Sequence, residues 1–273
     1  MRNITRLGMF AGVVTAAAMA ASSASATTID GIHFVGGDVF KSTTIWETIV
    51  VAPGTDLTGV GRVNTIETST PLCGGGGVCW TNGDNGRELT FRFEYHVEKI
   101  TAISATEGIA WFSGGLVSFW SDSTPDFDIT STQANAFASA TNGNLWLDLI
   151  GAGTGTVCVA LDGCASGLGT VIVLESNFDI AGSDLATVSS GSGAGFLDVV
   201  GGLAGLNFDT NTWPSGQDVQ LDSDFSKAPA ASPFPLRGSA DLESFAVPEP
   251  GSLLLLGTGL LGWAGMRRRR ARA

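Results

Sequence analysis

The stretch Phe91–Glu98 reads Phe-Arg-Phe-Glu-Tyr-His-Val-Glu, an unbroken alternation of apolar and polar side chains. Successive side chains of a β-strand point to opposite faces, so this period of two predicts a strand with one buried face and one solvated face. It is the clearest part of a strand that we predict over Glu88–Ile103. The buried set is Phe91, Phe93, Tyr95 and Val97, and the solvated set is Arg92, Glu94, His96 and Glu98.

Short runs of apolar or β-branched residues, bounded by Gly, Pro, Asn or Asp, recur on both sides of this stretch. No long amphipathic helical run separates them, and 38 of the 273 residues are glycine, well above the usual ~7%. We therefore predict an all-β fold, an antiparallel β-sandwich or jelly-roll-like domain over residues 27–246. The further strands are predicted at Ile32–Val35, Thr43–Val51, Gly59–Glu67 with Gly61 at a bulge, Gly108–Trp120, Leu145–Ile150, Thr156–Leu161, Thr170–Asn177, Phe196–Val200, Val219–Leu221 and Ser239–Phe245.

Two segments of this domain have two interpretations each. Ala134–Ala140 is either a short helix or a loop rich in Ala and Ser. Lys227–Arg237 contains three prolines, so it is either a loop before the last strand or the start of a linker. On the second interpretation, residues 227–246 belong partly to that linker.

The N-terminus has the three parts of a secretory signal peptide. Arg2 and Arg6 form a basic start, Leu7–Ala21 is apolar, and Ala24-Ser25-Ala26 has the small-residue pattern of a cleavage site. We predict that signal peptidase removes residues 1–26 by cutting after Ala26. The mature chain then begins at Thr27, outside the cytoplasm.

The C-terminal residues 247–273 combine an extended motif, an apolar segment and a basic tail. Pro248-Glu249-Pro250 is extended because each proline fixes its own φ and restricts the preceding residue. Gly251–Met266 carries no charge, and as a helix it would span about 24 Å, slightly less than the ~30 Å of a bilayer core. The tail of residues 267–273 contains five arginines, which hold that end in the cytoplasm. We predict a transmembrane helix in this segment.

This order of parts resembles the PEP-CTERM sorting signal of exported bacterial proteins. In that family, Pro248, Glu249 and Pro250 correspond to the recognition motif, which a membrane enzyme called exosortase is thought to cut at or near. The resemblance implies a Gram-negative host that makes exopolysaccharide. It also implies an inner-membrane intermediate and a final location at the cell surface or in the extracellular matrix.

The domain between the two terminal signals is strongly acidic. Between Thr27 and Val247 there are seven basic and 25 acidic residues, a net charge near −18, compared with −12 for the whole chain. This charge argues against contact with nucleic acid or an anionic membrane surface. It fits a protein outside the cell that repels its own copies or takes up divalent cations.

The four cysteines form two closely spaced pairs, Cys73 with Cys79 and Cys158 with Cys164. Export permits disulfides, and glycine-filled loops suit them better than they suit zinc, whose paired ligands are usually closer in sequence. Three connectivities exist, of which we favour the two local bridges.

Catalytic signatures are absent from the sequence, and we predict no catalytic residue. Glu94 and Glu98 share one face of a strand but lie about 13 Å apart, beyond the 5–9.5 Å of glycosidase carboxylate pairs. No G-x-S-x-G, H-E-x-x-H or P-loop motif occurs. His33 and His96 are the only histidines, so a hydrolase triad would need one of them.

Two acidic clusters and several tryptophans leave room for binding functions. Hard oxygen ligands on loops suit Ca²⁺, although neither cluster has EF-hand spacing, so we assign no metal site or cofactor and keep calcium as an alternative. Tryptophans can stack on sugar rings, although most such residues pack in cores or at strand edges. The acidic candidates are Asp122, Asp126, Asp128, Asp218, Asp222 and Asp224, and the tryptophans are Trp80, Trp111, Trp120, Trp146 and Trp213.

The leading hypothesis is a non-enzymatic exported protein of the cell surface or exopolysaccharide matrix, processed by an exosortase-like enzyme. The matrix assignment comes from the resemblance. A calcium-dependent carbohydrate-binding module is the first alternative, and a polysaccharide-active enzyme is the second.

Overall fold

The computed structural model describes residues 26–35, 37–49, 52–69, 73, 77–102, 107–152, 156–159, 163–166, 173–177, 190–213 and 216–244. Residues 1–25 and 245–273, which contain most of the signal peptide and the whole sorting signal, lie outside these ranges. The elements are β1 (Thr27–Ile29), β2 (Ile32–Phe34), β3 (Asp38–Glu47), β4 (Asp56–Arg62), β5 (Thr65–Thr68), β6 (Val78–Thr81), a 3₁₀ turn (Asp84–Gly86), β7 (Glu88–Ala102), β8 (Glu107–Asp122), α1 (Gln133–Ala140), β9 (Asn144–Gly151), β10 (Thr156–Val159), β11 (Gly163–Ser166), β12 (Val173–Asn177), β13 (Ser190–Gly201), α2 (Gly205–Phe208), β14 (Val219–Lys227) and β15 (Leu236–Ser244).

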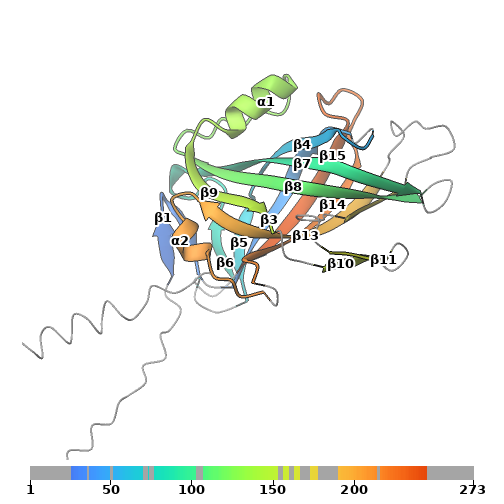
Figure 1. Cartoon of the computed structure of the whole chain (residues 1–273). Coiled ribbons are helices and arrows are strands. Elements are labelled where there is room, and N and C mark those ends of the chain that lie inside the picture. Colours follow the sequence, from blue (N-terminus) through green and yellow to red (C-terminus); the bar gives the residue numbers. More distant parts are fainter. Residues whose placement is uncertain are drawn as a thin grey trace, which may run out of the picture.

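The main sheet closes on itself as an antiparallel barrel (Figure 1). Around the ring, each strand pairs with the next in the order β3, β4, β7, β8, β12, β13, β14 and β15, and β15 pairs back to β3. In this last pairing Leu236 faces Glu47, and Glu243 faces Val39. The all-β prediction is confirmed, whereas the sandwich or jelly roll is wrong. A sandwich leaves each sheet with two edges, and here the β3–β15 ladder removes them.

Two short strands share one place in the ring, between β8 and β13. β12 pairs with Glu107–Trp111 of β8 and with the first residues of β13. Further along the same two long strands, β9 pairs with Leu116–Ser121 of β8 and with Leu197–Gly201 of β13. β12 and β9 therefore occupy the same position between β8 and β13, each along a different part of these two long strands.

The apolar face of β7 points into the interior of the barrel, as the alternating stretch predicts. Phe91, Phe93 and Tyr95 are buried, and the intervening polar side chains point outward. Gly61 faces Phe91 across the β4–β7 ladder, and a Cβ on Gly61 would lie 2.2 Å from the ring of Phe91. Gly59 stands in the same relation to Phe93. The prediction that Gly61 lies at a bulge is wrong. Because Gly61 has no side chain, it leaves room for the ring of Phe91.

Aromatic side chains fill one end of the barrel. Phe34 from the β1–β2 hairpin packs against Trp146 at 5.6 Å and Phe208 at 4.8 Å between ring centroids. The indole N–H of Trp146 donates to the carbonyl of Ile29 at 3.0 Å and so ties the hairpin to β9. Asp30 in the hairpin turn pairs with Arg87 at 2.7 Å. We call this region the plugged end.

Helix α1 covers the outside of the barrel over β4 and β7 (Figure 1). Thr132 caps its first turn by accepting from the N–H of Asn135, and Thr90 of β7 donates to the carbonyl of Ala140 at 2.8 Å. Ala136 and Ala140 are buried against Val60 of β4. The helical interpretation of Ala134–Ala140 is thus confirmed.

The predicted strands correspond to observed ones with shifted bounds, apart from one split and three omissions. Gly59–Glu67 is two strands, β4 and β5, separated at Val63 and Asn64; the Asn64 carboxamide oxygen accepts from the N–H of Thr43 at 2.6 Å. The short strands β1, β6 and β11 were not predicted. Residues 228–235 connect β14 to β15, so residues up to Ser244 belong to the barrel.

Candidate functional site

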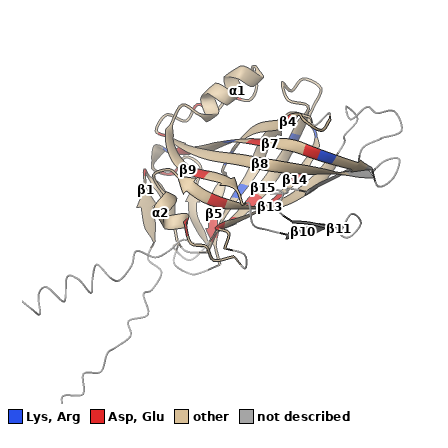
Figure 2. Ribbon diagram, viewed as in Figure 1, with Lys and Arg blue, Asp and Glu red and all other residues tan. Residues whose placement is uncertain are grey.

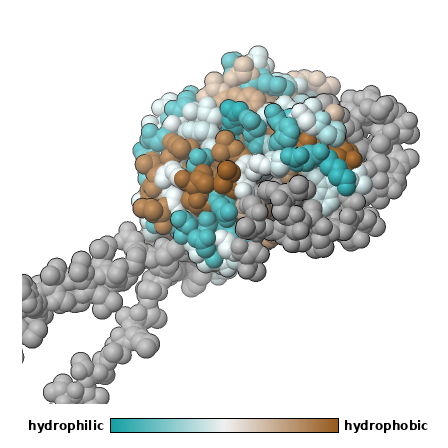
Figure 3. Space-filling view, in the orientation of Figure 1, coloured by the Kyte–Doolittle hydropathy of each residue, from teal (hydrophilic) through white to brown (hydrophobic). Residues whose placement is uncertain are grey.

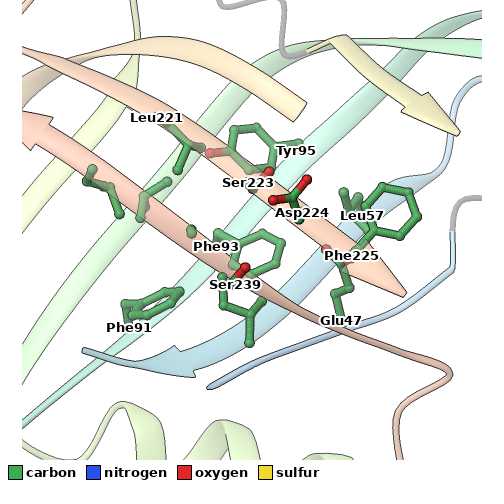
Figure 4. A pocket seen from close by; sticks show the side chains of 14 residues that line it. Glu47, Leu57, Phe91, Phe93, Tyr95, Leu221, Ser223, Asp224, Phe225 and Ser239 are labelled. Carbon is green, nitrogen blue, oxygen red and sulfur yellow. The ribbon is translucent and has the colours of Figure 1, made fainter. Parts of the chain in front are cut away.

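A chamber lies inside the barrel between β3, β4, β7, β8, β14 and β15 (Figure 4). Its cavity volume is about 50 Å³. Most of the lining is apolar and comes from side chains such as Leu57, Phe93, Leu221 and Phe225. The chamber therefore excludes most of the water that would solvate a polar group.

Glu47, the last residue of β3, places a carboxyl group in this apolar chamber. Its side chain is 7% exposed, and burial raises the pKa of the carboxyl to about 8. Among the described residues the carboxyl has neither a hydrogen bond nor an ion pair. At neutral pH Glu47 is therefore mainly a neutral acid that retains a proton.

Tyr95 supplies the second polar group of the chamber. The residue is 4% exposed, and its hydroxyl has no hydrogen-bond partner among the described residues. Burial, and then the nearby Glu47 carboxyl, raise the pKa of the hydroxyl. Because most buried polar groups in folded proteins have partners, the unpartnered hydroxyl of Tyr95 requires an explanation.

Sequence reasoning missed Glu47, although a signal for it exists. Ile45, Glu47 and Ile49 have the same parity in the predicted strand Thr43–Val51, so a strand that buries Ile45 also turns Glu47 inward. The structure bears this out up to the end of β3, with Ile45 and Glu47 both lining the chamber.

A shallow groove on the outer face brings His96 and Glu94, which sequence analysis singled out, together with Asp56 and Ser113, which it did not. His96 on β7 faces Asp56 on β4 and Ser113 on β8 in the strand register. The Nδ1 atom of His96 lies 2.7 Å from the Asp56 carboxylate. The Ser113 hydroxyl, however, donates to Glu98. The three residue types stand in the order of a hydrolase triad, but the bond that would activate the serine is not formed.

The two predicted acidic clusters are arranged differently from the prediction. Asp122 and Asp128 accept backbone N–H groups two residues ahead, from Thr124 and Thr130, and so act as turn-forming residues. The buried Asp218 accepts from the N–H groups of Val199, Thr210 and Asn211.

The structure places Asp218 near residues outside its predicted cluster. Burial, followed by the charges of Asp218 and Asp209, raises the pKa of Asp198. Asp222 and Asp224 are exposed on β14. No group of three or more His, Cys, Asp or Glu side chains in the described ranges could hold a metal ion, and calcium binding stays a prediction.

The tryptophans separate into core and surface residues. Trp80, Trp111 and Trp146 are at most 3% exposed, so they cannot stack on a sugar. Trp120 and Trp213 are partly exposed.

The structure shows one of the two predicted disulfides. Cys73 is bonded to Cys79, with 4.8 Å between their Cα atoms. Cys158 and Cys164 face each other in the β10–β11 register, but their side chains lie outside the described part, so the second bridge stays a prediction.

The outer surface has scattered charges and an apolar patch. In the ribbon diagram of Figure 2, Lys and Arg residues appear as separate blue segments among the strands. Figure 3 shows apolar residues gathered on the side that carries β9 and α2. There Leu203 is 56% exposed and Leu206 is 91% exposed, and the N–H of Leu203 donates to the carbonyl of Leu145, which is 40% exposed. Contiguous exposed apolar residues mark contact surfaces.

The predicted processing residues flank the barrel. Ala26 is exposed and directly precedes β1, which starts at the predicted mature N-terminus, Thr27. Pro248, Glu249 and Pro250 lie outside the described residues, as does the apolar segment Gly251–Met266. Within the described ranges, no helix has the length and hydropathy needed to cross a membrane.

Comparison with known proteins identifies the C-terminal signal. Residues 246–270 match the family model of the PEP-CTERM protein-sorting motif. No curated protein and no solved structure matches the chain. The motif implies an exported protein that passes through a membrane-anchored intermediate in a Gram-negative bacterium and is targeted to an exosortase-like enzyme.

Proposed function

We propose that the protein is a non-enzymatic β-barrel of the cell surface or exopolysaccharide matrix, delivered there by exosortase processing at or near Pro248-Glu249-Pro250. The sorting motif at residues 246–270 carries this proposal. The last barrel strand ends at Ser244, so the motif follows the folded domain almost directly. Cleavage there releases the barrel without cutting any of its strands.

Two surface features support a contact role over a catalytic one. The apolar patch around Leu203 and Leu206 offers a surface for association. The outer-face groove lacks a hydrogen bond between Ser113 and His96 that would make the serine a nucleophile. The partly exposed Trp120 and Trp213 favour carbohydrate binding as a second candidate function.

The processing step is tested by replacing Pro248, Glu249 and Pro250 with alanine in the host. We expect export and membrane insertion to continue, and the precursor to keep its arginine tail because the enzyme has lost its recognition motif. Mass spectrometry of surface protein distinguishes the two forms, and Ser252→Ala just beyond the motif is the matched control. A wild-type surface protein that retains Arg267–Ala273 on every chain would refute the proposal.

The matrix role and the carbohydrate alternatives are separated by two binding and activity measurements. The purified mature protein is applied to a glycan array with and without a calcium chelator; chelator-sensitive glycan binding would favour the carbohydrate-binding module. Incubation with host exopolysaccharide should leave the polymer unchanged in length. Shortening of the polymer would establish an enzyme instead.

A further inference from the structure

The apolar patch lies at the plugged end of the barrel, on the face that carries α2 and the start of β9 (Figure 3). Its members are the exposed residues Leu145, Val200, Leu203 and Leu206. On the inner side of the same segment, Phe208 of α2 is buried and packs against other aromatic rings of the plug. The segment therefore has one face in the core and one apolar face in solvent.

The strand register places the exit of the chain from the barrel beside this patch. Ser244, the last residue of β15, pairs with Val219 at the start of β14, and Val219 pairs with Leu197 of β13. Because neighbouring strands are about 4.8 Å apart, Ser244 lies roughly 10 Å from Leu197. Val200 is three residues further along β13, which puts it roughly 15 Å from Ser244. The patch and the exit therefore share one end of the barrel.

The Asp218 carboxylate fixes the segment that carries the patch. It accepts from the N–H of Val199 on β13 at 2.8 Å, and from the N–H groups of Thr210 and Asn211, which follow α2, at 2.6 Å each. Asp218 itself directly precedes β14, the strand that pairs with β15. The patch residues between these points therefore keep a constant position relative to the exit.

The chain beyond the exit is too short to hold the barrel far from a membrane. Gly251, the first residue of the predicted membrane segment, is seven residues after Ser244, so the connection spans at most about 24 Å. We propose that the apolar patch docks onto the bilayer in the membrane-anchored intermediate that the sorting motif implies, with Leu203 and Leu206 inserted just below the lipid headgroups. This proposal rests on the anchored intermediate and is independent of the matrix role.

The charges around the patch favour a zwitterionic lipid surface. Asp198 on β13 and Asp209 at the end of α2 belong to the same segment, and residues 196–213 contain no Lys or Arg. Anionic headgroups would repel these carboxylates, whereas zwitterionic headgroups leave apolar insertion as the main interaction. A second copy of the chain fits the patch less well, because two domains with a net charge near −18 repel each other.

The test measures which end of the barrel reaches the lipid. Residues 27–273, the chain of the anchored intermediate, are reconstituted in zwitterionic phosphatidylcholine vesicles that contain a lipid with a nitroxide on its acyl chain. A fluorophore is attached through Leu206→Cys or, in a second protein, through Lys227→Cys, which is exposed about 27 Å from Val219 at the other end of β14. The nitroxide quenches only a fluorophore that reaches the acyl chains. We expect at least fivefold more quenching at position 206 than at 227, and less at 206 when half of the phosphatidylcholine is replaced by anionic phosphatidylglycerol.

Variants of the labelled Leu206→Cys chain distinguish docking by the patch from simple tethering. Val200→Asn combined with Leu203→Asn should lower the quenching at least fivefold, because each CH₂ group withdrawn from lipid weakens binding about fourfold. Leu116→Asn is the matched control and should leave the quenching within twofold. Leu116 is 46% exposed, but it pairs with β9 about 17 Å further along that strand than Leu145.

The outcomes separate the docking from the anchor. A chain that does not float with the vesicles would refute the membrane segment and the docking together. A chain that floats but is quenched equally at positions 206 and 227 would refute the docking alone, and so would quenching that survives the two asparagines. A mature protein that dimerises, and becomes monomeric with Leu203→Asn, would show that a second copy covers the patch instead. If the double variant does not fold, the comparison of positions 206 and 227 still decides the question.

Discussion

Replacing Glu47 with glutamine should remove a large part of the pH dependence of folding. At a pH below about 4.5, the ordinary pKa of glutamate, Glu47 is neutral in both the folded and the unfolded protein, so its contribution to stability is complete. As the pH rises, the unfolded chain releases this proton while the folded barrel keeps it, up to a pKa of about 8. Stability is therefore lost as the pH rises, and the loss stops growing above about 8.

The size of the effect follows from the two pKa values. Each unit of difference corresponds to about 1.4 kcal/mol, so between pH 5 and pH 9 the wild type should lose about 4 kcal/mol relative to Glu47→Gln. Urea unfolding of the mature protein, followed by tryptophan fluorescence across this range, measures the free energy of unfolding of both proteins. Subtracting one curve from the other cancels groups common to both, including Asp38, whose pKa burial raises to about 6.

The control is the same substitution at Glu243, which is exposed on the neighbouring strand β15. Glu243→Gln should parallel the wild type across the range, since an exposed side chain stays solvated in both states. A difference between wild type and Glu47→Gln that changes by less than about 1 kcal/mol from pH 5 to pH 9 would refute the reasoning. It would mean that the carboxyl reaches water or a partner in the folded protein.

Three further predictions concern a close contact inside the barrel, the disulfides and the hydrogen bonds of Asp218. Gly61→Ala should cost about 1–3 kcal/mol in urea unfolding because the new Cβ would lie 2.2 Å from the Phe91 ring. Gly201→Ala should cost much less, because the nearest atom to its Cβ would be 3.9 Å away. Equal losses of stability in the two variants would contradict the packing argument. Replacing Cys73 and Cys79 with serine should lower stability by about 2 kcal/mol, and thiol labelling of the denatured, unreduced wild type should find no free thiol; two labelled thiols would disprove the predicted pair of bridges. Asp218→Ala should cost at least about 2 kcal/mol in urea unfolding because three backbone N–H groups lose their acceptor. Asp222→Ala should change stability by less than about 0.5 kcal/mol, with or without chelator. A chelator effect on the stability of the wild type would indicate bound calcium at this cluster.

Local patterns in the sequence predict the elements well, and the barrel closure poorly. The period of two at Phe91–Glu98 depends only on neighbouring residues, and it gives the correct faces of β7. The closing contact between Glu47 and Leu236 joins two distant parts of the chain, and no local periodicity specifies such a partner. A sandwich and a barrel need the same alternating strands, so they differ only in this pairing.

The candidate site could be anticipated in part for the same reason. The local sequence pattern predicts that Ile45 and Glu47 point to the same face of their strand. Whether Glu47 has a counter-charge depends on the residues that β7, β14 and β15 place opposite it, which the local pattern does not specify. Likewise, Asp218 directly precedes β14 and accepts N–H groups from β13 and from the segment after α2, whereas Asp222 and Asp224 lie further along β14. These partners come from distant parts of the chain, so the sequence spacing of the three aspartates does not predict them.

One end of the barrel lies closer to the sorting signal than the other. The Ser244 hydroxyl at the end of β15 donates to the carbonyl of Asp38 at 3.4 Å, which places the chain exit at the plugged end. Pro248 is four residues further on, so it lies at most about 14 Å from Ser244. Glu47 is at the opposite end of the ten-residue strand β3, about 30 Å from Asp38. If a membrane enzyme cuts at the motif, as we propose, it therefore works beside the plugged end and about the length of β3 away from Glu47.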